Sequence, residues 1–491
     1  MSSTTVSSIP VALTYDDVLL VPQKSDVRSR KQVTTVTRLS KNIKLQIPIV
    51  ASNMDTVCEH QTAVAMAREG GIGILHRFCS IQEQCEMVRK VKRAQSFLIE
   101  NPRMITPNRT KEEAVEGINW GGRKGGVSCL MVVENEHNRK LLGVVTKHDL
   151  IFAEANDPVT KLMTPVKNMV VCTDTKITLE EAREKMRKHR TSNIPIVGHN
   201  GELLYLVTLS DIVKLTENKR ASLDSRGRLL VGAAVGVKNE DMTRAAMLVE
   251  VGADVLVVDI AHGHSALCIE MIRRLKSDPR TQKVDIIAGN IATATAAEDL
   301  ILAGADGLKI GVGPGSICTT RLVAGSGVPQ LSAVMACARV AHRYNIPCIA
   351  DGGVKTSGDI CKAIAAGAET VMLGNMLAGT DEAPGRVLVK DGKKVKIIRG
   401  MAGFGANLSK AERERTLNED VFAEMVPEGV EGSVPCKGPI APIVRQLVGG
   451  LRSGMSYCGG FTIKEMQEKA RFVRMTGAGV RESGSHDISK L

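Results

Sequence analysis

A glycine-rich loop delivers one cysteine in a setting that suits nucleophilic chemistry. The segment 311–321 reads GVGPGSICTTR and directly follows a short apolar run. Cys318 is therefore expected just beyond the end of a strand, with reach, partial exposure and nearby backbone N–H groups that favour a thiolate. The chain has twelve cysteines without a C-x-x-C pair, and most are expected to be small buried side chains. The loop context singles out Cys318 as the candidate nucleophile.

Two further glycine turns, Asp351-Gly352-Gly353 and Gly374-Asn375, predict a phosphate site. Glycine lets backbone N–H groups approach a phosphate closely, and a neighbouring aspartate can accept hydrogen bonds from ribose hydroxyls. A single turn of this kind is common in loops and is weak evidence for a phosphate site. Because the two turns follow the last two members of a repeated strand pattern, they indicate a nucleotide monophosphate.

Helix-like stretches alternate with short β-branched runs throughout the second half, as in 247–265, 300–316 and 363–375. This alternation is typical of βα units on a parallel sheet, an α/β fold. Eight such runs predict a TIM (β/α)₈ barrel, which binds ligands at the carboxyl ends of its strands. A doubly wound open sheet is the alternative, but no G-x-G-x-x-G opens a helix after the first run. The expected strands are 48–52, 71–76, 229–236, 255–259, 285–290, 307–311, 347–351 and 370–374.

The long gap between the second and third strands contains an internal repeat. LMVVENEHNRKLLGVVTKHDLI (130–151) is echoed by IPIVGHNGELLYLVTLSDIV (194–213). Each copy predicts a hairpin that leads into T-x-x-D before a helix, and helix capping alone would explain those residues. The duplication within 96–220 resembles a tandem CBS (Bateman) pair, which implies a regulatory site for adenine or guanine nucleotides. Its ribose contacts would be Thr146, Asp149, Thr208 and Asp211.

Composition narrows the class of protein and of partner. The 491 residues amount to about three domains, and 43% apolar with 24% charged residues is typical of a globular chain. The net charge of +12 suits nucleic acid or phosphorylated small molecules. With 2% aromatic residues, stacking platforms are scarce, which disfavours nucleic acid. No apolar run approaches membrane-span length and no secretory signal pattern opens the chain, so we expect a soluble intracellular protein without a membrane partner.

The last three residues, Ser489-Lys490-Leu491, match the peroxisomal import tripeptide. They predict import into a peroxisome or glycosome. A fortuitous tail would leave the protein in the cytoplasm.

Several segments together resemble the IMP dehydrogenase/GMP reductase family over nearly the whole chain, insert included. They are 13–25, 53–57, 67–77, 287–294, 311–321, 350–354 and 427–432. The resemblance implies a homotetramer or octamer. It also implies that 1–95 is the first part of the catalytic barrel, 96–220 the CBS insert and 221–491 the rest of the barrel. That last part would include the active-site loop 311–321 and a flap over 399–432.

The resemblance implies roles for individual residues as well. Cys318 would attack C2 of a purine nucleotide. A monovalent cation, K⁺, would bind main-chain carbonyls of Gly313, Gly315 and Cys318, with Arg321 beside them. Asp259, Asn290 and Arg77 would lie at the nicotinamide and purine. The nucleotide itself would be held by Ser316, Asp351, Gly352, Gly353, Gly374, Asn375, Gly400 and Met401.

The two branches of the family differ in the step that follows the covalent adduct. The dehydrogenase oxidises IMP with NAD and hydrolyses the adduct with water that an Arg-Tyr dyad of the flap activates. The reductase expels ammonia from GMP and uses NADPH. The dyad position here reads Arg415-Thr416, and no tyrosine occurs between residues 345 and 456. We therefore expect reduction of GMP to IMP, similar to a trypanosomatid-type reductase with CBS domains. IMP dehydrogenase is the alternative, and an inactive nucleotide sensor is a remote one.

Other segments divide between the branches. Ser29-Arg30 resembles a pair that contacts the NADPH of a neighbouring subunit in reductases, and 53–55 is also reductase-like. The segments 259–265, 322–327 and 399–401 are closer to dehydrogenases. A dehydrogenase scaffold that lost its dyad accounts for both sets.

Thr320 and Glu428 are the candidate residues for the ammonia step. Expulsion of the amine requires a proton on its nitrogen, and a threonine hydroxyl can relay a proton but is a poor acid. By resemblance to the reductase branch, Glu428 would support Thr320. The alternative is that Glu428 only accepts a hydrogen bond from the purine ring.

Overall fold

The computed structural model describes residues 9–95, 97–119, 127–135, 137–217, 220–414 and 426–484. The chain forms two compact units, a barrel unit and an insert unit. The barrel unit contains Met1–Ala94, Arg220–Ser222 and Leu229–Leu491, and the insert unit contains Gln95–Lys219 and Leu223–Arg228. In the described part of the chain, no helix combines the length and the apolar character that a membrane crossing requires.

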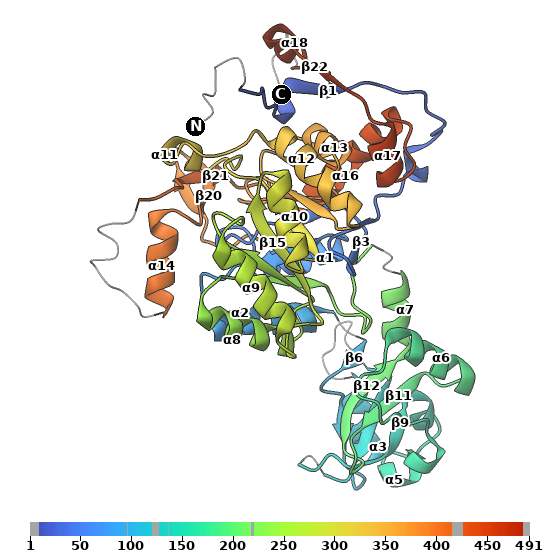
Figure 1. Cartoon of the computed structure of the whole chain (residues 1–491). Coiled ribbons are helices and arrows are strands. Elements are labelled where there is room, and N and C mark those ends of the chain that lie inside the picture. Colours follow the sequence, from blue (N-terminus) through green and yellow to red (C-terminus); the bar gives the residue numbers. More distant parts are fainter. Residues whose placement is uncertain are drawn as a thin grey trace. The chain divides into compact units, whose positions relative to one another are not determined.

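Eight parallel strands close the barrel, as the alternation of helix and strand predicts (Figure 1). The order around the barrel is β13-β14-β15-β16-β17-β18-β4-β5, and β13 pairs with β5 to complete the ring. The TIM-barrel prediction is thereby confirmed, and every expected strand coincides with one of the eight. Their bounds are β4 Ile49–Ala51, β5 Ile72–Leu75, β13 Val231–Val235, β14 Val255–Asp259, β15 Asp285–Ile291, β16 Gly307–Ile310, β17 Cys348–Asp351 and β18 Thr370–Leu373.

Helices surround this ring because each buries one apolar face against the strands. In α13, for example, Ile360, Cys361 and Ile364 are buried. Inside the ring, Val50, Ile74, Val257, Ile287 and Ile349 belong to one apolar cluster. Burial of one such side chain stabilises the fold by ~1.5–3 kcal/mol. The surrounding helices are α1 His60–Arg68, α2 Ile81–Ala94, α8 Asn239–Glu250, α9 Ala266–Ser277, α10 Ala294–Leu302, α12 Gln330–Arg343, α13 Ser357–Ala365 and α16 Ile440–Tyr457.

The barrel unit also contains smaller strands and helices, which lie in the segments near the chain ends and in the connections between the barrel strands. A three-stranded sheet is formed by β19 Leu388–Lys390, β20 Lys393–Arg399 and β21 Glu431–Pro435. The chain ends meet where β1 Val18–Leu20 pairs with β22 Phe472–Arg474. The remaining strands and α-helices of the described part of this unit are β2 Thr37–Arg38, β3 Lys44–Leu45, α11 Thr320–Val323, α14 Phe404–Glu414, α17 Ile463–Lys469 and α18 Gly477–Glu482.

The insert unit is built from two similar halves. One sheet has the order β10-β9-β8-β7 and the other β11-β12-β6. The repeated segments form the hairpins β8–β9 and β11–β12, each followed by a helix, α4 or α7. The bounds are β6 Leu98–Ile99, β7 Met104–Ile105, α3 Lys111–Asn119, β8 Cys129–Val133, β9 Leu141–Thr146, α4 Lys147–Leu150, α5 Val159–Leu162, β10 Thr164–Pro165, α6 Leu179–His189, β11 Asn193–Val197, β12 Leu203–Thr208 and α7 Leu209–Glu217.

Candidate active site

The loop after β16 carries Cys318 and is bonded to the segment that precedes β21. The Thr319 N–H donates to the Glu428 carbonyl (3.0 Å), and the Val430 N–H donates to the Ile317 carbonyl (3.0 Å). Cys318 and Gly429 form an isolated β-bridge between these two hydrogen bonds. The pairing fixes Glu428 beside the cysteine loop although about a hundred residues separate them in the chain.

A hydrogen-bonded chain links Cys318, Thr320 and Glu428. The Cys318 Sγ lies 3.2 Å from the Thr320 Oγ1, which lies 2.8 Å from the Glu428 Oε2. Because an ionised carboxylate only accepts, the threonine hydroxyl donates to Glu428, and the thiol donates to the threonine. The three predicted catalytic side chains therefore form one path along which a proton can move.

Exposure separates Cys318 from most of the other cysteines. Cys318 and Cys436 are half-buried, whereas the other ten are buried. Burial raises the pKa of Cys337 and of Cys361 to about 12, which keeps both thiols protonated and unreactive. The spectator role expected for most of the cysteines agrees with this burial.

Four strands contribute polar side chains to a cluster at the carboxyl end of the barrel. The Lys309 Nζ of β16 contacts Asp259 of β14 (3.4 Å) and Asp351 of β17 (3.2 Å). It also bonds to the Asn290 Oδ1 of β15. The Asn290 Nδ2 donates to the Asp351 Oδ2 (2.8 Å). Asp259, Asn290 and Asp351 were predicted from the sequence, and Lys309 was missed because it stands inside the apolar run GLKIG.

Arg77 is the second cation at Asp259: its Nε lies 3.7 Å from the Asp259 Oδ2, whereas Lys309 contacts the Oδ1. Burial raises the pKa of Asp259, but Lys309 and Arg77 outweigh it and hold that pKa below its usual value. Asp259 is therefore an ionised carboxylate shared by two cations. The predicted grouping of Arg77, Asp259 and Asn290 is found at one end of the barrel.

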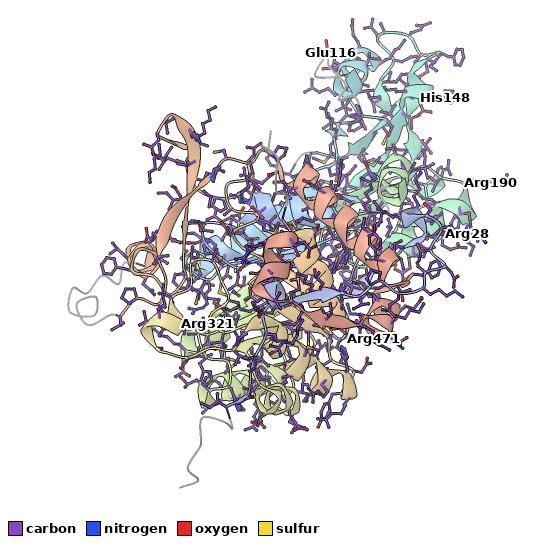
Figure 2. All side chains as sticks on the ribbon, turned by 90° about the horizontal axis from the view of Figure 1, so that it is seen from above. Arg28, Glu116, His148, Arg190, Arg321 and Arg471 are labelled. Carbon is purple, nitrogen blue, oxygen red and sulfur yellow. The ribbon has the colours of Figure 1, made fainter. Side chains whose placement is uncertain are left out.

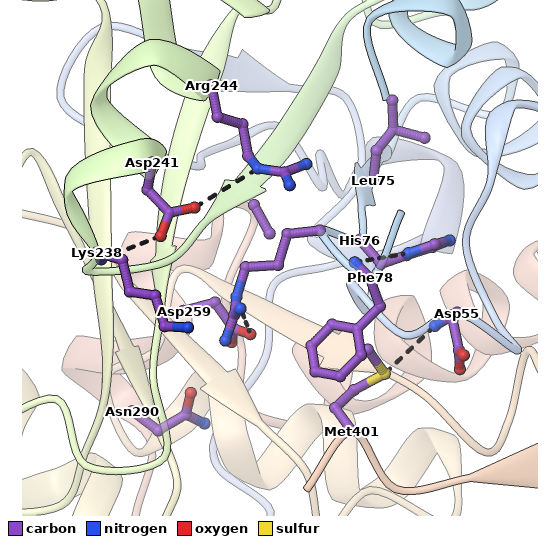
Figure 3. A network of polar contacts seen from close by, with 12 residues as sticks. Asp55, Leu75, His76, Phe78, Lys238, Asp241, Arg244, Asp259, Asn290 and Met401 are labelled. Carbon is purple, nitrogen blue, oxygen red and sulfur yellow. Dashed lines mark hydrogen bonds and ion pairs between the residues drawn. The ribbon is translucent and has the colours of Figure 1, made fainter. Parts of the chain in front are cut away.

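The loop that carries Arg77 is anchored from α8. The buried Arg244 donates through Nη1 to the Cys79 carbonyl (3.1 Å) and to the Gln84 Oε1 (2.8 Å). Its Nε faces the Asp241 Oδ1 at 3.5 Å (Figure 3). Within the loop, the Phe78 N–H donates to the His76 Nδ1 (3.2 Å), also drawn in Figure 3. These contacts restrict the main chain on both sides of Arg77.

A cavity of about 490 Å³ opens beside the cysteine loop. Gly352 has a φ of +90°, and a Cβ there would lie 3.2 Å from the Gly315 nitrogen, so only glycine lets the two loops approach. The Lys437 Nζ donates to the Asn375 carbonyl (2.6 Å) and lines the same cavity, as does Ile398. Six of the predicted nucleotide residues line it: Ser316, Asp351, Gly352, Gly353, Gly374 and Asn375.

Gly400 and Met401, the other two predicted nucleotide residues, lie outside the lining of this cavity. The Gly400 N–H donates to the Val430 carbonyl (3.1 Å). The Met401 Sδ accepts from the Asp55 N–H at 3.4 Å (Figure 3), and Asp55 forms an ion pair with Arg399. The contacts hold the start of the flap against the barrel. The dyad position Arg415-Thr416 is outside the described residues.

The expected cation ligands occupy the turn before Cys318. Gly313 has a φ of +84°, and a Cβ there would lie 2.6 Å from the Arg321 Cγ. Arg321, labelled in Figure 2, donates to the Val328 carbonyl (2.6 Å) and the Val312 carbonyl (3.3 Å). The Gly315 carbonyl also accepts from the Cys318 N–H (3.2 Å). Main-chain carbonyls are ligands that suit K⁺, so this donor set fits the expected cation.

The remaining predicted residues lie elsewhere. Ser29 and Arg30 are exposed, and Ser29 caps the short helical turn 30–32. In the insert unit, the Thr146 Oγ1 donates to the Asp149 Oδ2 (2.7 Å) and the Thr208 Oγ1 to the Asp211 Oδ2 (2.6 Å). Both T-x-x-D pairs thus cap the first turns of their helices, which is the simpler of their two interpretations.

The insert unit contains a basic cavity of about 500 Å³ next to its second hairpin. Arg183 and Arg187 of α6 line it together with Arg190, which Figure 2 labels. Met186, Thr191, Ser192 and Leu209 complete the lining. Three arginines around one hollow suit an anionic ligand.

Known proteins match this chain over almost its whole length. The model of the IMP dehydrogenase / GMP reductase domain matches residues 12–486. A GMP reductase of Leishmania donovani is 77% identical over 484 residues, covering 99% of this chain and 98% of the relative. An inosine-5'-monophosphate dehydrogenase of Nitrosopumilus maritimus is 50% identical, covering 97% and 98%.

Solved structures agree with these relatives. The C318A variant of GMP reductase from Trypanosoma brucei in complex with guanosine 5'-monophosphate is 74% identical, with a TM-score of 0.83 and coverage of 98% of this chain and 99% of that chain. The same organism's enzyme in complex with guanosine 5'-triphosphate is 66% identical, with a TM-score of 0.71 and coverage of 96% and 99%. The barrel, the cysteine loop and these matches agree, and the chain belongs to the IMP dehydrogenase/GMP reductase family.

Proposed function

We propose that this enzyme is a GMP reductase, which converts GMP, NADPH and two protons to IMP, NADP⁺ and an ammonium ion. The observation that carries the proposal is the hydrogen-bonded chain Cys318–Thr320–Glu428. It provides a nucleophile and a proton donor on one loop, with a carboxylate behind the donor. This is what loss of an amine from a cysteine adduct requires.

The chain's own residues divide the chemistry between them. The Cys318 thiol passes its proton through Thr320 to the Glu428 carboxylate, and the resulting thiolate adds to C2 of GMP. Thr320 gives a proton to the departing amine and regains one from Glu428, so ammonia leaves and a thioimidate to Cys318 remains. NADPH supplies a hydride to C2, after which the C–S bond breaks and Cys318 leaves as a thiolate with IMP released. Each bond formed to sulfur is thus broken again within one turnover.

The absence of a tyrosine from the flap favours the reductase reaction over IMP oxidation. Hydrolysis of the adduct needs an activated water, and the segment between residues 345 and 456 contains no tyrosine for the expected dyad. Similarity supports the same choice, since the relative named GMP reductase is 77% identical and the dehydrogenase 50%. The T. brucei complex with guanosine 5'-monophosphate supports GMP as the substrate.

The binding roles follow from the residues around the cysteine. We assign the phosphate to the glycine turns that line the 490 Å³ cavity and the ribose to Asp351. Asp259, Asn290 and Arg77 are assigned to the nicotinamide side, and Ser29-Arg30 to the NADPH of a neighbouring copy in a tetramer or octamer. K⁺ would be held by the carbonyls of Gly313, Gly315 and Cys318, where it would fix the shape of the cysteine loop.

The direct test follows nicotinamide absorbance with purified protein. We expect oxidation of NADPH that depends on GMP and releases ammonia in equal amount, and no reduction of NAD in the presence of IMP. The Cys318→Ala variant sets the baseline for both assays. Production of XMP from IMP and NAD at a comparable rate would assign the dehydrogenase reaction instead.

We propose that the insert unit is a CBS pair that binds purine nucleotides and regulates the barrel. Its support is the duplicated hairpin, the three-arginine cavity and the T. brucei complex with guanosine 5'-triphosphate. Titration of ATP and GTP into the full chain should alter its turnover, and Arg187→Ala with Arg190→Ala should weaken that response. Unchanged turnover at saturating nucleotide would leave the insert without a regulatory role.

We also propose peroxisomal or glycosomal import through Ser489-Lys490-Leu491. A fluorescent fusion that ends in these residues should enter the organelle, and the same fusion without Leu491 should stay outside it. Import of the truncated fusion would refute the signal.

A further inference from the structure

One buried lysine lies between the residues assigned to the nucleotide and those assigned to NADPH. Lys309 is 3% exposed, and its Nζ contacts Asp259, Asn290 and Asp351 from three neighbouring strands. Asp351 lines the nucleotide cavity, whereas Asp259 faces Arg77. A single ammonium group therefore interacts with both sides of the site.

The neighbouring strand β15 approaches the backbone of Lys309 closely at Gly289. A Cβ on Gly289 of the next strand would lie 2.7 Å from the Lys309 Cβ and 2.3 Å from its carbonyl oxygen. Only glycine at 289 allows this close approach of β15 to β16 beside Lys309. The Asn290 Nδ2 also donates to the Gly311 carbonyl (2.8 Å), which links the cluster to the start of the cysteine loop.

The charges in the cluster keep the lysine ionised. Burial lowers the pKa of Lys309, but attraction to Asp351 and Asp259 outweighs it and leaves the pKa above its usual value. Arg77 is the other cation that faces Asp259, and Asn290 is the neutral partner. Opposite charges interact strongly where water is excluded. If one carboxylate attracts the shared ammonium less, the ammonium therefore interacts more strongly with the other carboxylate.

We infer that Lys309 is a positioning residue that couples the binding of GMP to the binding of NADPH. The inference rests on the proposed function. When ribose hydroxyls donate to Asp351, that carboxylate attracts Lys309 less, and the ammonium is held more by Asp259 and Asn290. NADPH then binds to the Asp259 carboxylate and the Asn290 amide after Lys309 has already restricted their positions. Each ligand therefore strengthens the binding of the other.

A structural lysine whose partner lies at the amino end of β16 provides the matched control. Lys276 of α9 forms an ion pair with Asp306, which directly precedes β16. Its replacement removes a similar pair from the barrel but touches no residue assigned to a ligand. A role that is only structural predicts the same outcome for both lysines, and coupling predicts different outcomes.

The experiment measures the coupling with turnover blocked. In the Cys318→Ala chain, NADPH is titrated by calorimetry without GMP and with saturating GMP, and the ratio of the two dissociation constants is the coupling factor. Coupled sites typically give a factor of ~5–150. We expect such a factor in the Cys318→Ala reference and in Cys318→Ala/Lys276→Met, and a factor near 1 in Cys318→Ala/Lys309→Met. Titration of GMP with and without NADPH must return the same factor.

A second variant covers the case in which Lys309→Met does not fold. Lys309→Arg keeps the charge, but its planar guanidinium cannot meet the three acceptors as the ammonium does. The coupling factor of Cys318→Ala/Lys309→Arg should lie between that of the Cys318→Ala reference and that of Cys318→Ala/Lys309→Met. An unchanged factor in a folded Lys309 variant, or a factor of 1 in the reference, would overturn the inference. Failure of the reference to bind GMP and NADPH at all would refute the proposed function itself.

Discussion

The two ends of the barrel use charged residues in opposite ways. At the amino end, the carboxylate of Asp285 has its hydrogen bonds made by other groups of the protein. Asp285 accepts from the Ser40 hydroxyl (2.6 Å) and from the Asn42 main chain (2.8 Å) and side chain (2.7 Å). At the carboxyl end, Lys309 is shared among several acceptors, and one of them, Asp351, also opens to a cavity.

The difference matches the division of work in a TIM barrel, in which one end stabilises the fold and the other binds ligands. A carboxylate with all its hydrogen bonds made inside the protein has little left for a ligand. A carboxylate that shares its partner can exchange part of that interaction for a ligand's hydroxyl group. We therefore expect changes at the carboxyl end to alter activity and changes at the amino end to alter stability.

The largest effect is expected from Cys318→Ala. Removal of the sulfur prevents the adduct, so GMP-dependent oxidation of NADPH should fall by at least ~10³-fold. GMP should still bind, because the cavity residues remain in place. Cys436→Ala, at the other half-buried cysteine, is the control and should keep its rate. Near-normal turnover by the Cys318 variant would remove the covalent step from the mechanism.

Glu428→Gln should have the next largest effect. The amide keeps the shape and can still bond to Thr320, but it cannot return a proton, so turnover should fall ~10²-fold with GMP affinity little changed. The exposed Glu431, three residues later, supplies the control Glu431→Gln. If Glu428→Gln instead weakens GMP binding and leaves kcat intact, the carboxylate only binds the purine.

Asp285→Ala tests the amino end of the barrel. Ser40 and Asn42 would lose a buried partner, and we expect a loss of about 1–3 kcal/mol in the free energy of unfolding. Chemical denaturation gives that value, and kcat/KM for GMP at moderate temperature should stay unchanged. A large fall in kcat/KM without a change in stability would break the comparison between the two ends.

The smallest effect concerns His342, also at the amino end. Its hydrogen bond to Glu369 (3.0 Å) is the main reason why the pKa of His342 is raised. A raised pKa in the folded state stabilises the protein at low pH, and this contribution is lost as pH rises through that pKa. Because the side chain is 40% exposed, solvent screening limits the gain to below about 1 kcal/mol.

The measurement for His342 compares the native chain with His342→Gln. The difference in melting temperature should favour the native chain at about pH 5.5 and shrink towards about pH 8.5. Activity should not depend on the substitution. A difference that grows with pH would mean that the neutral imidazole, not the imidazolium, is the favoured partner of Glu369.

Much of the barrel and of the site could be predicted because the signals are local. Each strand is a short β-branched run with its own turn residues, so all eight were found, and their carboxyl ends define where ligand residues gather. Cys318, Asp351 and Gly352 each follow such a run directly. Their types and their positions in the chain are sufficient to group them.

Pairing across long separations could not be predicted in this way. The partners of Lys309 lie on three other strands, and the apolar run around it gave no indication that its side chain points into the barrel's end. Lys437 reaches the carbonyl of Asn375, and Arg399 reaches Asp55. None of these pairs has a spacing that a sequence pattern could reveal.

The amino-acid sequence by itself determined the barrel, the duplicated insert, the candidate nucleophile Cys318 and the glycine turns, because hydrophobic periodicity and backbone conformation depend on near neighbours in the chain. Only the tertiary structure decided that Thr320 donates to Glu428 and that one ammonium joins Asp259 to Asp351. The physical reason is the closure of the barrel. It brings charges from distant segments into a region with little water, where electrostatic interactions are strong and each polar group must find a partner.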